Sequence, residues 1–251
     1  MNRRFATKFS FLFVVLALWQ VLAGLQLWPN YLFPSPAEVL EVYTAGIADG
    51  TLLEATVSSL ARLGVGYAIS LLVGVPLGLI WGRSRLVQDT VGVLMIGLQA
   101  LPSITWLPIA LLWFGLSEMA VIFVVFMGAV WAIAIATRDG IQSVPANSIR
   151  SARTLGANSL FLTIQVLLPA SLPSMITGMK LGWSFAWRSL MAGELLYYGV
   201  GLGQRLSQGR ELNDMSLVVA VMIIIIVFGL IFERGVFQPL ERRIREQFNL
   251  G

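Results

Sequence analysis

The chain has 251 residues, of which 57% are hydrophobic and 12% charged, and its formal net charge is +4. A water-soluble core of this length does not need so much apolar sequence, so the composition predicts that a lipid bilayer is the solvent for much of the chain. The sequence contains no cysteine and no histidine, which excludes disulfides, thiolate and imidazole metal sites, cysteine nucleophiles and a Ser-His-Asp triad within it.

Six apolar stretches predict membrane-spanning helices, and several of them reach the roughly 20 apolar residues that a helix needs to cross the hydrocarbon core. In chain order they cover residues 9–28, 57–81, 90–114, 119–137, 160–196 and 217–232. They lack the alternating pattern of barrel strands, so the sequence predicts an all-α, polytopic helical bundle with about six transmembrane helices. Pro102 and Pro108 interrupt the third stretch, which is therefore either one kinked helix or two shorter helices.

Most of the 17 lysine and arginine residues fall in loops that share one side of the membrane if the spans alternate. These positions are Arg3, Arg4, Lys8, Arg83, Arg85, Arg138, Arg150, Arg153, Arg234, Arg242, Arg243 and Arg245. The positive-inside rule then predicts that both termini are cytoplasmic, together with the polar loop of about residues 138–160. A cleaved signal peptide over residues 1–23 is an alternative interpretation of the first stretch, and it leaves the later spans oriented the same way.

The cytoplasmic loop contains a segment that predicts a short helix from about Pro145 to Leu155. Proline suits the first turn of a helix, and Gly156 can adopt the left-handed conformation that ends one. Ile149, Ala152 and Leu155 are expected to share one face, which could seat in a groove on a partner. The residues assigned to this helix and its stop are Ile149, Arg150, Ala152, Arg153, Thr154, Leu155 and Gly156. The alternative is a basic loop that serves membrane topology alone.

Residues 150–156 read RSARTLG, and residues 166–169 read VLLP after a gap of nine. This spacing resembles the EAA signature of ABC-importer permeases, in which Glu-Ala-Ala, three residues and Gly precede nine residues and then an aliphatic residue, any residue, Leu and Pro. The resemblance implies that an ATPase subunit docks on this coupling helix. Arg150 and Ser151 replace the family's Glu and first Ala, so a salt bridge made through that Glu is not carried over.

Three further segments resemble the nitrate, sulfonate, taurine and bicarbonate group of such permeases, namely FPSP at 33–36, WFG at 113–115 and GLG at 201–203. The resemblance implies a type I ABC-importer (MetI-like) permease fold, with residues 1–251 forming one transmembrane permease domain. It also implies a subunit that forms the pathway for a small anion, nitrate, bicarbonate or alkylsulfonate/taurine, across a bacterial inner membrane. The motifs do not select among these substrates.

The sequence has two lysines, Lys8 and Lys180, and neither stands in the Gly-Lys-Ser/Thr context of a phosphate-binding loop. We therefore expect no enzymatic activity and no cofactor in this chain, with ATP and Mg bound by a separate ATPase. The resemblance implies two ATPase subunits, a second copy of the permease, a periplasmic or lipid-anchored solute-binding protein and surrounding lipid, without nucleic acid. The glycines at 74, 78 and 82 could support the contact between the two copies or pack within one chain.

Ionisable residues in the fifth stretch are functional candidates, because a charged group in a membrane is costly unless it faces a partner, water or a cavity. Arg188, together with Lys180, is expected to offer positive potential to a small anion, and Glu194 is a further pathway candidate. The alternatives are an ion pair between Arg188 and Glu194, and a Lys180 side chain that reaches the membrane interface. Trp183 and Trp187, four residues apart, are interpreted as packing residues.

A secondary transporter or channel that is not coupled to ATP is the alternative function. It would explain the predicted spans but gives no reason for the docking-helix signature. An intramembrane enzyme is disfavoured, because without His or Cys it would need a carboxylate pair and the acids within the spans are few and scattered.

Overall fold

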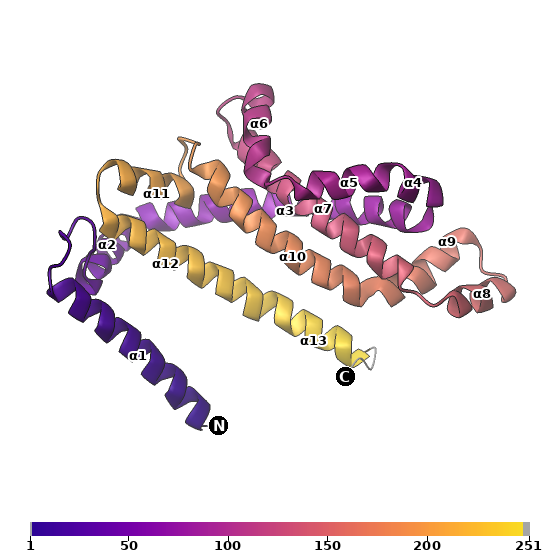
Figure 1. Cartoon of the computed structure of the whole chain (residues 1–251), viewed down its shortest axis with the longest axis horizontal. Helices are drawn as coiled ribbons and strands as arrows, with labels where there is room; N and C mark the ends of the chain where they lie inside the picture. The colour runs from indigo at the N-terminus through magenta and orange to yellow at the C-terminus, as the bar shows by residue number, and fades with distance from the viewer. Residues whose placement is uncertain (1, 248–251) are drawn as a thin grey trace. The chain divides into compact units, whose positions relative to one another are not determined.

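The computed structural model describes residues 2–247, and the regular structure in that range is entirely helical (Figure 1). In chain order the elements are α1 (Asn2–Gly24), α2 (Pro36–Ala48), α3 (Thr51–Arg83), α4 (Arg85–Asp89), α5 (Val91–Ala100), the 3-10 turn η1 (Ser103–Trp106), α6 (Leu107–Phe114), α7 (Glu118–Gln142), α8 (Ala146–Thr154), α9 (Ser159–Phe161), the π-helical segment η2 (Leu162–Leu167), α10 (Leu168–Glu194), α11 (Leu202–Glu211), α12 (Met215–Phe232), the π-helical segment η3 (Glu233–Phe237) and α13 (Gln238–Gln247). The predicted cytoplasmic termini fall partly on residues 1 and 248–251, which lie outside the described residues.

The helices reproduce the six predicted stretches, and the all-α prediction is confirmed for the described residues. Within these, four helices are long and apolar enough to span a membrane, at Thr51–Arg83, Glu118–Gln142, Ser159–Glu194 and Met215–Ile244. The pair α5 and α6 counts as a fifth span only if the two helices are taken together, and the apolar part of α1, Ser10–Gly24, is shorter. The sequence predicted about six spans, and the difference lies in α1 and in this pair.

The third stretch is two short helices bent by 103°, so the two-helix alternative is the correct one. Pro102 lies in the break between α5 and η1, where its missing N–H and its effect on Leu101 stop the first helix. Pro108 does not break a helix, because it occupies the first turn of α6, where a proline N–H would have no partner in any case.

The chain divides into two compact units, Met1–Ser59 with Tyr198–Val227 and Leu60–Tyr197 with Phe228–Gly251. In the first unit α2 begins with a capping box, in which Ser35 and Glu38 satisfy each other's backbone N–H groups. The Tyr43 hydroxyl donates a 2.6 Å hydrogen bond to the Ala220 carbonyl and so ties α2 to α12. Burial raises the pKa of Tyr43 above its ordinary value, which keeps the hydroxyl protonated as this bond requires.

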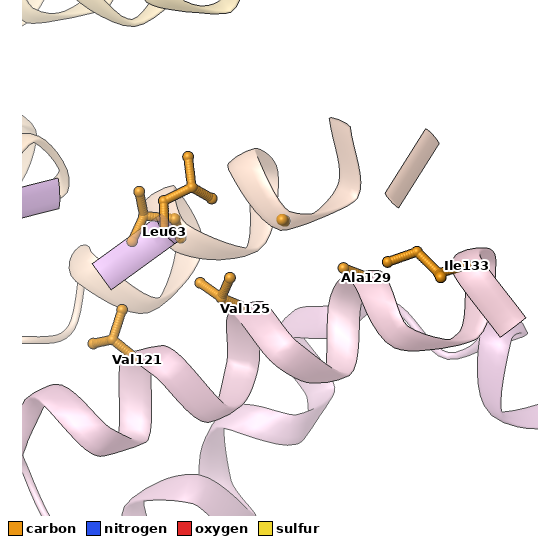
Figure 2. Packing of buried hydrophobic residues seen from close by; sticks show 7 residues of the cluster. Leu63, Val121, Val125, Ala129 and Ile133 are labelled. Carbon is orange, nitrogen blue, oxygen red and sulfur yellow. The ribbon is translucent and has the colours of Figure 1, made fainter. Parts of the chain in front are cut away.

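The core of the second unit lies among α3, α7 and α10 (Figure 2). Its buried side chains are Leu63 of α3, Val121, Val125, Ala129 and Ile133 of α7, and Ala186 and Leu190 of α10. Helix α10 runs antiparallel to α7, since Gly193 at the end of α10 approaches Val121 and Gly140 near the end of α7 approaches Ser171. The second unit is therefore built on three long helices, and two of them, α7 and α10, are antiparallel neighbours.

The glycine ridge of α3 faces α7 of the same chain. A Cβ atom at Gly74 would lie 2.9 Å from the Val130 carbonyl oxygen, and one at Gly82 would lie 2.9 Å from the Ile141 side chain. Gly78 approaches α7 even more closely, at Ala134 and Thr137, and the order of these contacts shows that α3 and α7 run parallel. The ridge thus serves packing within the chain, which was the alternative to a contact between two copies.

Candidate functional site

The short helix predicted from about Pro145 to Leu155 is present as α8, which has nine residues, Ala146–Thr154. Pro145 is its N-cap rather than its first residue, and Gly156 ends it in the left-handed conformation at φ 85°. The Gly156 N–H donates to the Arg153 carbonyl at 2.9 Å and the Ala157 N–H donates to the Ala152 carbonyl at 3.0 Å. These two bonds form a Schellman motif, which fixes the direction in which the chain leaves the helix.

The apolar residues of α8 do not act as one face. Ile149 and Ala152 pack against a cluster of the chain's own buried side chains, formed by Ile141, Val144, Leu162 and Leu167. Leu155, by contrast, is 88% exposed, because it is the C-cap residue and its backbone has left the helical path. Sequence reasoning placed all three on one docking face, whereas the structure leaves Leu155 exposed and ties the other two to α7 and η2.

The rim of α8 is polar and exposed. Arg150, Arg153 and Thr154 are all exposed, and the Thr154 hydroxyl donates back to the Arg150 carbonyl at 3.1 Å. Arg153 lies in the last turn, where a cation interacts favourably with the helix dipole. The helix therefore offers one exposed leucine beside two guanidinium groups.

The second half of the motif connects α8 to the long helix α10. Val166 packs against the same cluster as Ile149 and Ala152, and Pro169 lies in the first turn of α10. The Arg83 guanidinium at the end of α3 donates to the hydroxyls of Ser159 and Thr163. Packed side chains and hydrogen bonds thus connect α8 and η2 to the ends of α3, α7 and α10.

Glu194 does not pair with Arg188. Its carboxylate is 0% exposed and accepts a 2.7 Å hydrogen bond from Nη1 of Arg62, whose side chain is 5% exposed. Arg62 also donates from Nη2 at 2.8 Å and from Nε at 3.2 Å to Oε1 of Glu118, which is 60% exposed. The ring of Tyr197 lies against the guanidinium, 5.0 Å from its central carbon. Arg62 thus takes the place that the sequence-based alternative gave to Arg188, in a triad on three helices of which Arg62 and Glu194 are buried and Glu118 is exposed.

Lys180 and Arg188, the two predicted cationic pathway residues, have different surroundings. Lys180 Nζ lies 2.6 Å from Oε1 of Glu233 and 3.9 Å from Oε2 of Glu241. Arg188 is exposed and its guanidinium lies 5.5 Å from the centre of the Phe185 ring. Lys180 is therefore neutralised by carboxylates of η3 and α13, and neither residue takes Glu194 as its ion-pair partner.

The tryptophans of α10 were interpreted as packing residues, and Trp183 is one. Its ring lies 4.3 Å from the ring of Phe232 and 5.1 Å from that of Tyr67, in an edge-on arrangement with the latter. Trp187 packs against the core of the second unit. Within the described residues no group of three or more Asp, Glu, His or Cys side chains could hold a metal ion.

Residues 74–246 match the sequence model of a family described as binding-protein-dependent transport system inner membrane component. The chain belongs to this family. A protein of Methanocaldococcus jannaschii that carries the name of an ABC transporter permease is 34% identical over 93% of this chain and 89% of that protein. The taurine transport system permease protein TauC of Escherichia coli is 28% identical over 97% of this chain and 90% of TauC. The nitrate import permease protein NrtB of Synechocystis is 30% identical over 88% of this chain and 82% of NrtB.

A solved structure, the MetNI methionine ABC transporter in inward-facing conformations, superposes on this inner membrane component with a TM-score of 0.70. The alignment covers 77% of this chain and 96% of the matched chain, at 20% sequence identity. At that identity the likeness concerns the fold. The MetI-like permease fold that the sequence resemblance implied is thereby confirmed.

Sequence reasoning missed two members of the triad in this inner membrane component, Arg62 and Glu118. A usable signal existed, because an arginine inside a predicted span requires a counter-charge. The sequence offered Glu194 for this role but could not choose its partner, since Arg62 and Glu194 are 132 positions apart. The partners of Lys180, Glu233 and Glu241, were missed for the same reason.

Proposed function

We propose that this chain is the permease subunit of an ATP-driven importer that moves a small anion, nitrate, bicarbonate or an alkylsulfonate such as taurine, across the inner membrane. The observation that carries the proposal is α8, a capped helix that presents exposed Leu155 beside Arg150 and Arg153 and whose other face packs on the chain's own helices. The names of the relatives, which include taurine, nitrate and bicarbonate permeases, support the substrate class.

The energy for transport comes from separate ATPase subunits. Phosphate-binding loops need a lysine in a Gly-Lys-Ser/Thr context, and the two lysines of this chain stand elsewhere. We place ATP, Mg and their chemistry on two partner ATPases, and assign no catalytic reaction and no cofactor to this chain. The complete importer would contain a second copy of the permease and a periplasmic or lipid-anchored solute-binding protein.

The ATPase docks at α8. Exposed Leu155 would enter an apolar groove of the ATPase, and the guanidinium groups of Arg150 and Arg153 would meet its polar rim. Because Ile149 and Ala152 are packed on the chain's own cluster, α8 would move together with the ends of α7 and η2. A rigid displacement of the ATPase groove would in this way reach α10 and the helices around it.

The charge distribution supports the orientation. Arg83 at the end of α3, Arg138 near the end of α7 and the arginines of α8 all belong to one end of the second unit. By the positive-inside rule this end faces the cytoplasm, which gives cytoplasmic N- and C-termini for an even number of spans. The triad of Arg62, Glu118 and Glu194 then belongs to the external end.

Co-purification tests the proposal. Leu155→Asp should abolish capture of the ATPase encoded for the same importer, because a carboxylate cannot be desolvated in an apolar groove without a partner. It should leave the thermal midpoint of the permease unchanged, since the Leu155 side chain is 88% exposed and little of it is buried. Leu212→Asp is the matched control, because Leu212 is 66% exposed but lies between α11 and α12, and it should capture the ATPase normally.

Two results would contradict the proposal. Unimpaired ATPase capture and ATP-dependent uptake by the Leu155→Asp variant would remove α8 as the docking site. Transport by the wild-type chain without ATP, with no ATPase captured, would favour a secondary transporter or channel instead.

A further inference from the structure

We infer that the guanidinium of Arg62 is a binding group for a singly charged oxyanion, and that the carboxylate of Glu118 occupies the anion's position in this structure. The inference rests on the proposed function, because it assigns a site on the chain to the transported class of anion. It differs from the pathway predicted from sequence, which assigned this role to Arg188 and Lys180.

The hydrogen-bond geometry leaves one edge of Arg62 suited to an oxyanion. The Nη1 group is committed to Glu194 at 2.7 Å, and the Tyr197 ring covers the flat side of the guanidinium. The remaining edge, Nε and Nη2, donates both of its N–H groups to the single atom Oε1 of Glu118. A guanidinium edge matches two oxygens of a planar or tetrahedral oxyanion through two parallel bonds, which Glu118 does not supply here.

Burial shows which of the two carboxylates can leave. Glu194 is 0% exposed, so its departure would place two unpaired charges in the protein interior. Glu118 is 60% exposed at the first turn of α7, so its carboxylate can rotate into water and remain solvated. Glu194 is therefore the permanent counter-ion of Arg62, and Glu118 is the ligand that an anion can replace.

The charge balance favours a monoanion. When Glu118 turns into water, an anion of charge −1 restores the same pairing around Arg62 that the carboxylate provided. Nitrate, bicarbonate and a sulfonate group each carry this charge and offer at least two oxygens to the Nε and Nη2 donors. Arg62, Glu118 and Glu194 lie near the start of α3, at the start of α7 and at the end of α10, opposite the end that carries Arg83 and α8.

Anion binding to the purified full-length chain tests the inference directly. The thermal midpoint is titrated with potassium nitrate, bicarbonate or methanesulfonate, with potassium chloride at equal ionic strength as the reference. In the Glu118→Gln variant at least one of the three anions should bind about 10-fold or more tightly than in the wild type, because the internal competitor that occupies most of the sites has been removed. The Arg62→Lys substitution should abolish the anion-specific shift, because an ammonium group lacks the two-donor edge.

Glu54→Gln is the matched control, since Glu54 is an exposed carboxylate on the first turn of the same helix as Arg62 and outside the triad. It should leave anion binding at the wild-type value. If Arg62→Lys does not yield folded protein, the Nε–H resonance of Arg62 in the Glu118→Gln variant decides. That resonance should move on addition of the anion, while the resonance of exposed Arg188 should not.

The inference is overturned if none of the three anions binds more tightly to Glu118→Gln than to the wild type, or if the Arg188 resonance moves in place of that of Arg62. These outcomes leave the proposed function standing, because ATPase capture through Leu155 is measured separately. If the wild-type chain captured no ATPase, the proposed importer function would be refuted, and the anion titration could still be interpreted by itself.

Discussion

The two glutamates that share Arg62 should differ sharply in their effect on stability. Both carboxylates form ion pairs of nearly equal length with the same guanidinium, 2.7 Å for Glu194 and 2.8 Å for Glu118. Their exposures, 0% and 60%, are far apart. Distance alone therefore predicts similar effects of substitution, whereas burial predicts different ones.

Removal of one partner of a buried ion pair costs about 3–5 kcal/mol, because the other charge is left uncompensated in the interior. Glu194→Gln should reduce the free energy of unfolding by this amount. Glu118→Gln should cost less than about 1 kcal/mol, since a pair with one well-solvated member is weakened by solvent screening. With a thermal midpoint that moves about 2–4 °C per kcal/mol in a chain of this size, the expected losses are about 6–20 °C and at most about 4 °C.

Thermal unfolding of the purified variants in one detergent, followed by circular dichroism or tryptophan fluorescence, measures both losses. The double variant should show a coupling of about 0.5 kcal/mol or more, because both carboxylates contact one guanidinium. Equal losses for the two single variants, or a larger loss for Glu118→Gln, would refute the argument from burial.

Three further predictions concern the ridge, the stop of α8 and the last helix. Gly78→Leu should lower the free energy of unfolding by about 1–3 kcal/mol or more, because a side chain there would meet the backbone of α7. An unchanged thermal midpoint with an altered oligomeric state would show that the ridge faces a second copy instead. Gly156→Val should weaken ATPase capture and lower the free energy of unfolding by about 1–2 kcal/mol, because the Gly156 φ of 85° is unfavourable for a β-branched residue. Gly156→Asn should be tolerated, and equal behaviour of the two variants would contradict this reasoning. Lys180→Met should accelerate tryptic cleavage after Arg242, because the substitution removes the cation that Glu233 and Glu241 share. The free energy of unfolding should fall by less than about 1 kcal/mol, and unchanged cleavage would show that these ion pairs do not hold α13.

Local signals in the sequence were sufficient for the secondary structure that positions α8. The left-handed stop at Gly156 was predicted, and the break at Pro102 was one of the two alternatives given for the third stretch, because each depends on the conformational range of one residue and its immediate neighbours. The predicted helix of about Pro145 to Leu155 differs from α8 by one residue at each end. The prediction that Leu155 shares one face with Ile149 and Ala152 was wrong, because the exposure of Leu155 depends on where the chain goes after the helix ends.

The sequence by itself therefore determined that the chain is helical, that its solvent is a bilayer and, to within one residue at each end, where the short helix of the polar loop lies. It also indicated that Glu194 needed a partner, because an unpaired charge in a membrane protein is costly. Only the tertiary structure decided that this partner is Arg62, that Glu118 joins the pair and that the glycine ridge faces α7. The physical reason is that helix propensity and hydropathy act over a few residues, whereas ion pairing across 132 positions depends on which helices pack together.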